Sequence, residues 1–313
     1  MGARRPVKAA VLPEGTRDWA RVAVLDGGGQ LVTLDEAEAL VWTDAGGRGD
    51  SEARLTALLE EYDNIRWVQL PWAGVESYAE AGVFDHEHIW TCGKGVYAPP
   101  VAEHALSLAL AGLRDLKRRS LAHAWGEQSG ISLIDGRVTI FGGGGIAQEL
   151  LRLLRPFGCA VSVVRRHAQP MDGVETVLDF AARYEALKGA DVVFVALALT
   201  PETRGLIGEI EFELMEPHAW LVNVARGEHV VTEDLVIALR ENAIGGAALD
   251  VTDPEPLPEG HPLWALPNCI VTPHTANTED MAIPLLTARI EENVRRYAAD
   301  QPLLGVVDPN LGY

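Results

Sequence analysis

Two residues that follow short apolar segments, Arg226 and His274, are of types that can bind an anion and exchange a proton. The guanidinium group of Arg226 could hold a carboxylate through two parallel hydrogen bonds. The imidazole of His274 titrates near neutral pH and could donate or accept a proton. Each residue also has an ordinary interpretation: Arg226 could be a surface arginine after a strand, and His274 could be a structural histidine. The sequence pattern around the two residues has to decide between the catalytic and the ordinary interpretation.

A glycine turn is the most informative part of that pattern. The apolar strand Val138–Phe141 runs directly into four glycines and then into a helical pattern at 148–157, the context in which a glycine motif indicates dinucleotide binding. Gly142 permits the tight turn, Gly144 lets the backbone approach a pyrophosphate, and the small Ala147 lets helix and strand pack closely. The helix N-terminus offers N–H groups to the phosphates. A flexible glycine loop is the alternative; we assign coenzyme binding to Gly142, Gly144, Gly145 and Ile146.

Alternating strands and helices must position these residues. Short apolar segments alternate with helical patterns along the first hundred residues, which is typical of a parallel sheet with helices between its strands. The expected strands there are 8–12, 40–42, 65–70 and 89–91, with a helix at 51–62. Pro99-Pro100 interrupts the pattern, so we expect a domain boundary there, followed by one long helix, Val101–Arg119.

A second alternation follows the glycine turn. The expected strands are 161–164, 191–196, 219–223, 244–250 and 270–272, with helices between several of them. This order predicts a doubly wound parallel sheet and the α/β fold class. A helix over Glu279–Asp300 lies beyond the last strand and is expected to pack back on the first domain.

Composition restricts the kinds of partner. The chain has 313 residues, of which 48% are hydrophobic, no long uncharged apolar stretch and a formal net charge of −19. Nucleic acids and anionic membranes bind basic surfaces, so this charge argues against both. The charged Met1–Pro6 lacks a following apolar region, so we expect no secretion signal and a cytoplasmic protein. Cys92, Cys159 and Cys269 are far apart and are expected to be reduced, the latter two in the core.

Four further segments carry a resemblance to a known family. These segments are Thr200–Ile207, Leu221–Gly227, Ala248–Pro258 and Pro267–His274. Together with the glycine turn, they closely resemble the D-isomer-specific 2-hydroxyacid dehydrogenases over residues 65 to 277. The resemblance implies a Rossmann-type nucleotide-binding domain at 99–277, inserted in a smaller flavodoxin-like α/β substrate domain made of 1–98 and 278–313. The helix from Val101 corresponds to the family's dimer-forming helix, so a homodimer is also implied.

The resemblance assigns roles to individual residues. Arg226 would anchor the substrate carboxylate, His274 would exchange the proton, and Glu255 would pair with His274 and raise the pKa of its imidazole. By residue type alone, Glu255 is a turn residue in a proline-rich loop and Asp250 is an ordinary strand-end aspartate. The resemblance places Asp250 near the nicotinamide, and the implied coenzyme site also includes Thr200 and Val224.

A second loop of the family pattern lies in the first domain. Pro71–Glu76 matches the family's loop whose backbone N–H groups bind the substrate carboxylate. We therefore assign substrate binding to the backbone of Ala73, Gly74 and Val75. Trp72 would line the substrate pocket, with a core tryptophan as the alternative. Lys94, between two glycines, is a solvated loop lysine or faces the cleft.

Two arginines depart from the pattern of NAD-dependent relatives. After the strand 161–164, where those relatives place an aspartate for the adenosine ribose, this chain has Arg165 and Arg166. A carboxylate would accept a hydrogen bond from the ribose 2′-OH and repel a 2′-phosphate, whereas arginines do the reverse. The expected coenzyme is therefore NADP, with NAD as the alternative.

The combined pattern predicts an NADP-preferring reductase of a small 2-keto acid, closest to the glyoxylate/hydroxypyruvate reductase branch of the family. An NAD-dependent dehydrogenase of other specificity and a redox-sensing, corepressor-like binding protein are the alternatives. Asp85–His88 has metal-ligand residue types but fits a solvated connector, so no metal site is expected. Glu103 and His104 are assigned to structure or domain coupling.

Overall fold

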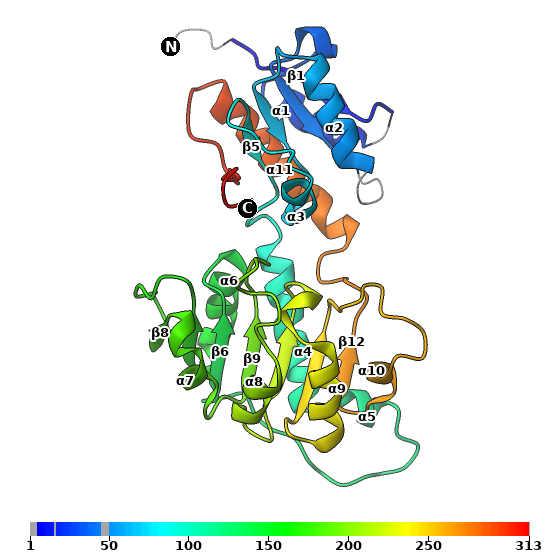
Figure 1. Ribbon diagram of the computed structural model, residues 1–313, viewed down its shortest axis with the longest axis vertical. Coiled ribbons are helices and arrows are strands. Elements are labelled where there is room, and N and C mark those ends of the chain that lie inside the picture. The colour runs from blue at the N-terminus through cyan, green and yellow to red at the C-terminus, as the bar shows by residue number, and fades with distance from the viewer. Residues whose placement is uncertain (1–4, 16, 45–49, 313) are drawn as a thin grey trace. The chain divides into compact units, whose positions relative to one another are not determined.

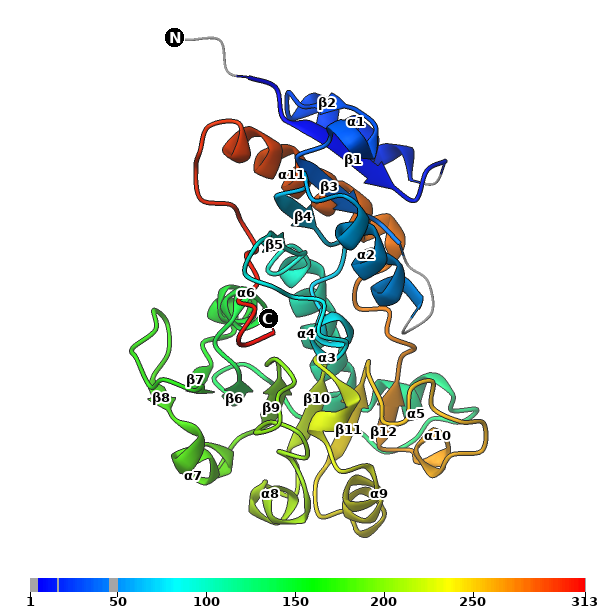
Figure 2. The same ribbon diagram turned by 45° about the horizontal axis from the view of Figure 1, so that its top comes forward.

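The computed structural model describes residues 5–15, 17–44 and 50–312. The chain divides into two compact units, a terminal unit formed by Met1–Tyr97 and Thr278–Tyr313 and a central unit formed by Ala98–Asn277. Each unit has its own parallel sheet, seen in two views in Figures 1 and 2. The prediction about a secretion signal concerns Met1–Pro6, of which residues 1–4 lie outside the described residues.

The terminal unit contains a five-stranded parallel sheet in the order β2-β1-β3-β4-β5. Its strands are β1 (Lys8–Leu12), β2 (Gln30–Leu31), β3 (Ala39–Trp42), β4 (Trp67–Gln69) and β5 (Ile89–Thr91). Its helices are α1 (Asp18–Asp26), α2 (Asp50–Glu61), α3 (Glu76–Glu80) and α11 (Glu279–Tyr297). All four residues of β3 are buried, as expected of a central strand that is covered on both faces.

Helix α11 joins the C-terminal segment to the N-terminal part of this unit. Tyr297 stacks on Trp67 of β4 with ring centroids 5.2 Å apart. The buried Asn293 donates a hydrogen bond to the Gln69 side chain at 3.0 Å. The helix also packs along α1, so the last helix packs back on the first α/β fold as expected.

The central unit contains a seven-stranded parallel sheet in the order β12-β11-β10-β9-β6-β7-β8. Its strands are β6 (Arg137–Phe141), β7 (Ala160–Val164), β8 (Thr176–Leu178), β9 (Val192–Val195), β10 (Trp220–Asn223), β11 (Gly246–Leu249) and β12 (Cys269–Val271). Its helices are α4 (Ala98–Leu113), α5 (Leu116–Ser120), α6 (Gly145–Leu154), α7 (Arg183–Leu187), α8 (Glu209–Leu214), α9 (Thr232–Glu241) and α10 (Pro262–Ala265).

Both faces of the central sheet are covered by helices. Along β9, Val193 and Val195 belong to the buried cluster that includes α7, α8 and α9, whereas Val192 and Phe194 belong to the cluster that includes α4 and α6. Successive residues of a strand point to opposite faces, so these apolar strands supply two cores. The predicted α/β class with a doubly wound sheet is confirmed.

The strand order reverses between β6 and β9. From β6 the chain builds outward through β7 and β8, then returns to β9 and continues in the other direction to β12. In open parallel sheets, ligands bind outside the carboxyl ends of the strands at such a reversal. The loops after β6 and β9 are therefore the place to look for a bound molecule.

The prediction of one continuous helix over Val101–Arg119 is wrong. Helix α4 begins earlier, at Ala98, with the two prolines in its first turn, where their missing N–H groups cost nothing. It ends at Leu113, and Asp115 then takes a left-handed conformation with φ 51°. Its carboxylate accepts a hydrogen bond from Arg118 Nε at 2.6 Å, which stabilises the break before α5.

Smaller differences concern short elements and one cysteine. The strands β2 and β8 were not predicted, because neither contains a buried residue and so neither has the apolar pattern of a core strand. Cys269 is buried as expected, but Cys159 is only partly buried. Within the described ranges, no helix is long and apolar enough to cross a membrane.

Candidate active site

The residues predicted to do chemistry follow three neighbouring strands of the central sheet. Arg226 follows β10, Asp250 and Glu255 follow β11, and His274 follows β12. These strands are adjacent and parallel, so their carboxyl ends meet at one edge of the sheet.

His274 and Glu255 form a direct pair. Nδ1 of His274 lies 2.8 Å from Oε1 of Glu255, and about half of each side chain is exposed. This hydrogen bond is the main cause that raises the pKa of His274, against the opposing effects of burial and of the Arg226 charge. The same bond lowers the pKa of Glu255. With Nδ1 donating to the carboxylate, Nε2 is the ring nitrogen that can exchange a proton with a bound molecule.

The buried carboxylate of Asp250 organises the loop that carries His274. It accepts hydrogen bonds from Thr272 Oγ1 at 2.6 Å and from the backbone N–H groups of Thr275 and Ala276, each at 2.9 Å. The backbone carbonyl of Asp250 accepts a hydrogen bond from the His274 N–H at 2.8 Å. His274 has a left-handed backbone with φ 51°, which these bonds on either side hold in place.

Asp250 stays ionised in this arrangement. Burial raises its pKa, but hydrogen bonds from His104, Thr272 and the loop backbone overcome that effect and lower the pKa to about 2. His104, on α4, lies with Nε2 3.3 Å from Asp250 Oδ1 and 3.1 Å from Thr272 Oγ1. His104, which the sequence analysis assigned to structure or domain coupling, therefore supports the loop that carries His274 from within the central unit.

The backbone of Arg226 is held by two buried residues that sequence reasoning missed. Asn223, the last residue of β10, donates from Nδ2 to the Arg226 carbonyl at 2.8 Å. The ring of His229 lies beside the Arg226 N–H and carbonyl. The sequence signal that could have pointed to His229 is its position three residues after Arg226. The guanidinium group donates from Nη1 to the Ala225 carbonyl at 2.7 Å.

The glycine turn fits a dinucleotide. Gly142 has φ 118°, and a Cβ added there would lie 2.2 Å from the Ala196 carbonyl oxygen, so no other residue fits between β6 and β9. A Cβ on Gly144, the residue before α6, would meet nothing within 4 Å. Helix α6 begins at Gly145, with Ile146 in its first turn and Ala147 fully buried. The turn thus leaves open space at a helix N-terminus, as a pyrophosphate requires.

Arg165 lies over this turn. A Cβ on Gly143 would be 3.0 Å from both Cδ and Nε of Arg165. In the loop after β9, a hydrogen bond with Thr200 is the main cause that lowers the pKa of Glu202, and the charge of Arg166 acts in the same direction. The Thr200 N–H donates to Thr203 Oγ1 at 2.8 Å. Val224 is buried directly after β10.

The four residues assigned to the substrate loop belong to the terminal unit. They lie between β4 and α3, with Val75 buried and Ala73 exposed. Within the described part of the chain, the N–H groups of Ala73, Gly74 and Val75 donate to no protein acceptor. The Arg17 guanidinium lies 5.9 Å from the centre of the Trp72 ring, so Trp72 is a partly exposed stacking surface and not a core residue.

The remaining polar candidates have local partners. His88 Nδ1 lies 2.7 Å from the Asp85 carboxylate, which also accepts the His88 N–H at 2.9 Å. No group of three or more metal-ligating side chains occurs among the described residues. The Lys94 carbonyl accepts a hydrogen bond from Arg289 at 3.1 Å.

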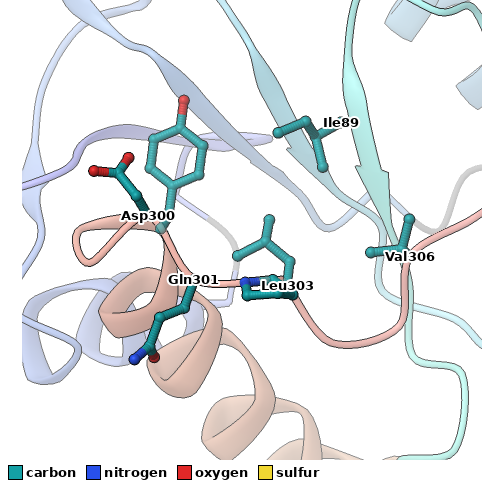
Figure 3. A pocket seen from close by; sticks show the side chains of 7 residues that line it. Ile89, Asp300, Gln301, Leu303 and Val306 are labelled. Atoms are coloured by element: carbon teal, nitrogen blue, oxygen red, sulfur yellow. The ribbon is translucent and has the colours of Figure 1, made fainter.

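A cavity of about 530 Å³ lies elsewhere in the terminal unit. Figure 3 shows Ile89 of β5 on one wall and Leu303 and Val306 from the C-terminal segment on the others. Asp300 and Gln301 also line it. None of the residues predicted for the site belongs to its lining.

Comparisons with known proteins identify the family of the chain. Residues 104–276 match the family model for the NAD-binding domain of D-isomer specific 2-hydroxyacid dehydrogenases. An uncharacterized protein of Corynebacterium melassecola is 36% identical over 257 residues, 80% of this chain and 84% of that protein. Glyoxylate/hydroxypyruvate reductase A of Photorhabdus laumondii is 33% identical over 214 residues, 67% of this chain and 68% of that protein.

A solved structure is also similar over the whole chain. The D-isomer specific 2-hydroxyacid dehydrogenase of Xanthobacter autotrophicus Py2, in complex with NADPH and MES, has a TM-score of 0.84 and 26% identity. The similarity covers 99% of this chain and 100% of that one. The predicted resemblance is thereby confirmed: the chain belongs to the D-isomer-specific 2-hydroxyacid dehydrogenase family and is an NAD(P)-dependent enzyme of that family.

Proposed function

We propose that this enzyme is an NADP-preferring reductase that converts a small 2-keto acid, of the glyoxylate or hydroxypyruvate kind, to the D-2-hydroxy acid. The observation that carries the proposal is the 2.8 Å pair of His274 and Glu255, with the Arg226 charge acting on both, at one edge of the sheet. The name of the Photorhabdus relative supports the substrate class.

The catalytic residues have different tasks in this reaction. Arg226 holds the substrate carboxylate and polarises the neighbouring carbonyl through its planar fork of donors. Protonated His274 gives its Nε2 proton to the carbonyl oxygen as that oxygen gains negative charge. Glu255 stabilises the imidazolium before transfer and fixes the tautomer. A bound nicotinamide coenzyme would supply the hydride to the carbonyl carbon.

The central unit would be the dinucleotide-binding domain, and the terminal unit would be the substrate domain. Ionised Asp250 would face the nicotinamide end. Thr200 and Val224 would border the coenzyme, and Gly142, Gly144, Gly145 and Ile146 would receive its pyrophosphate. In the terminal unit, the N–H groups of Ala73, Gly74 and Val75 would bind the substrate carboxylate, with Trp72 beside it.

The preference for NADP rests on Arg165 and Arg166. The position of Arg165 above the glycine turn supports a contact with a 2′-phosphate, as does the NADPH bound in the Xanthobacter structure. One charge-assisted hydrogen bond contributes about 1.5–3 kcal/mol, which corresponds to about ten- to a hundredfold in affinity.

We also propose a homodimer formed through the segment that follows α4. Helix α4 buries seven of its 16 residues in its own unit. Beyond it, large apolar side chains are strongly exposed, with Trp125 97% and Leu121 69% exposed. Exposed apolar residues of this size favour a protein partner, and we propose that a second copy of the chain covers them.

Turnover of a panel of 2-keto acids with NADPH and with NADH tests the function. We expect reduction of small 2-keto acids with a kcat/KM for NADPH about tenfold or more above that for NADH. Arg165→Asp should reverse the preference, because a carboxylate repels the 2′-phosphate and accepts the ribose hydroxyl. Equal kcat/KM values for the two coenzymes in the unchanged enzyme would contradict the coenzyme assignment. Failure to reduce any 2-keto acid would contradict the reaction.

A further inference from the structure

His229 is a buried histidine to which the reaction above gives no task. It lies in the short turn Gly227–His229 after β10, and 0% of the residue is exposed. Burial lowers the pKa of His229 below its ordinary value, so the ring is neutral near pH 7. A neutral imidazole offers one N–H donor and one acceptor nitrogen.

Both ring nitrogens have backbone partners from different loops. Nε2 lies 3.3 Å from the carbonyl oxygen of Ala198, in the loop after β9. Nδ1 lies 3.3 Å from the backbone nitrogen of Arg226. We assign the hydrogen to Nε2, because this tautomer makes two hydrogen bonds: Nε2 donates to the Ala198 carbonyl and Nδ1 accepts the Arg226 N–H. A hydrogen on Nδ1 would make only one, to the Arg226 carbonyl at 3.0 Å.

The Arg226 carbonyl is close to the same ring and has another donor. It lies 3.0 Å from His229 Nδ1 and accepts from Asn223 Nδ2 at 2.8 Å. The two loops are also joined further along, where the Ile207 N–H donates to the His229 carbonyl at 2.9 Å. The imidazole therefore adds a link between the loops at Arg226 itself.

We propose that His229 is a positioning residue that sets the backbone of Arg226 against the loop after β9. That loop contains Thr200, which we assign to the coenzyme side, so the link keeps the substrate anchor in register with the coenzyme. The proposal rests on the proposed function, because it needs Arg226 to hold the keto acid. A displacement of about 1 Å in such an anchor can reduce the rate about a hundredfold.

Three substitutions separate the two halves of the link. His229→Asn keeps an acceptor near the Nδ1 position, His229→Gln keeps a donor near the Nε2 position, and His229→Leu removes both. The matched control is His218→Asn. His218 is a histidine of the same unit that pairs with Asp191 at 2.8 Å, before β10 and so at the opposite end of that strand.

The measurements are KM for the best keto acid, Ki for oxamate as a keto acid mimic, Kd for NADPH by fluorescence titration, and Tm. We expect His229→Leu to raise KM and Ki about ten- to a hundredfold and to leave the Kd for NADPH within about twofold. His229→Asn should retain lower KM and Ki values than His229→Gln, because it keeps the contact with Arg226. The control should match the unchanged enzyme.

Unchanged KM and Ki in His229→Leu would overturn the positioning role. So would an equal loss of affinity for oxamate and NADPH, since that is the mark of a general structural defect. If His229→Leu does not fold, equal KM and Ki values for the Asn and Gln variants would overturn it. Failure of the proposed function gives a different result: the unchanged enzyme neither reduces a keto acid nor binds oxamate.

Discussion

The hydrogen bond between His274 and Glu255 predicts how the activity depends on pH. The bond raises the pKa of His274, so the imidazolium that donates the proton persists to higher pH than in an isolated histidine. The reductive kcat/KM should therefore hold through neutral pH and fall as pH rises through the raised pKa. Oxidation of the hydroxy acid needs the neutral ring and should increase over the same range.

Replacing Glu255 with Gln tests this coupling. The amide keeps a hydrogen-bonding group but removes the charge, so the alkaline limb of the reductive profile should move to lower pH. The measurement is kcat/KM against pH with saturating coenzyme and a keto acid that does not titrate in the range. If the alkaline limb of Glu255→Gln stays at the pH of the unchanged enzyme, Glu255 does not set the pKa of His274, even if both residues are needed for activity.

Arg226→Lys should cost far more activity than a change that conserves charge normally does. An ammonium group is a point charge and cannot reproduce a planar fork that binds carboxylate and carbonyl together. The loss of one charged hydrogen bond is about 1.5–3 kcal/mol, so kcat/KM should fall about ten- to a hundredfold or more. The Kd for NADPH should stay unchanged, because Arg226 binds substrate. Near-normal kcat/KM toward every reduced keto acid would remove Arg226 from the role of anchor.

At the scale of elements, the strand–turn–helix unit from β6 to α6 has two glycines with different requirements. Gly142→Ala should destabilise the fold by about 1–3 kcal/mol or more, because it forces a side chain into a positive φ and against the Ala196 carbonyl. Gly144 has φ −83°, which alanine can adopt, and Gly144→Ala would place its new methyl group in open space. It should keep the Tm of the unchanged enzyme and weaken NADPH binding. A matched loss of Tm in both variants would mean that Gly144 has a structural role instead.

The sequence was most informative where chemistry coincides with the end of a strand. Arg226, Glu255 and His274 each follow an apolar segment, and parallel strands bring such positions to one edge. The end of α4 could not be read in the same way, because Leu116 continues the helical spacing of apolar residues from Leu113. The break is the left-handed backbone of Asp115, which no sequence signal marks. The role of His229 was also hidden, since its partners are backbone atoms and one of them, the Ala198 carbonyl, is close to it only in the fold.

At the scale of the whole molecule, the proposed homodimer gives a direct measurement. Replacing Leu121 and Trp125 with Ser removes exposed apolar surface without touching a core. In sedimentation or light scattering, the unchanged enzyme should have twice the mass of one chain, and the double variant should move toward the monomer. Ile210→Ser, which changes an exposed apolar residue on α8, should remain a dimer. A monomeric unchanged enzyme would refute the proposal.

The terminal unit is built from both ends of the chain, and this has a consequence during protein synthesis. The central unit, Ala98–Asn277, is complete before the residues that follow it have been translated. Helix α11, whose Tyr297 and Asn293 contact β4, is among these later residues. Because domains that are continuous in sequence can fold as they emerge from the ribosome, the central unit is expected to mature first. The terminal unit must wait, with its N-terminal part unfinished, until helix α11 has emerged.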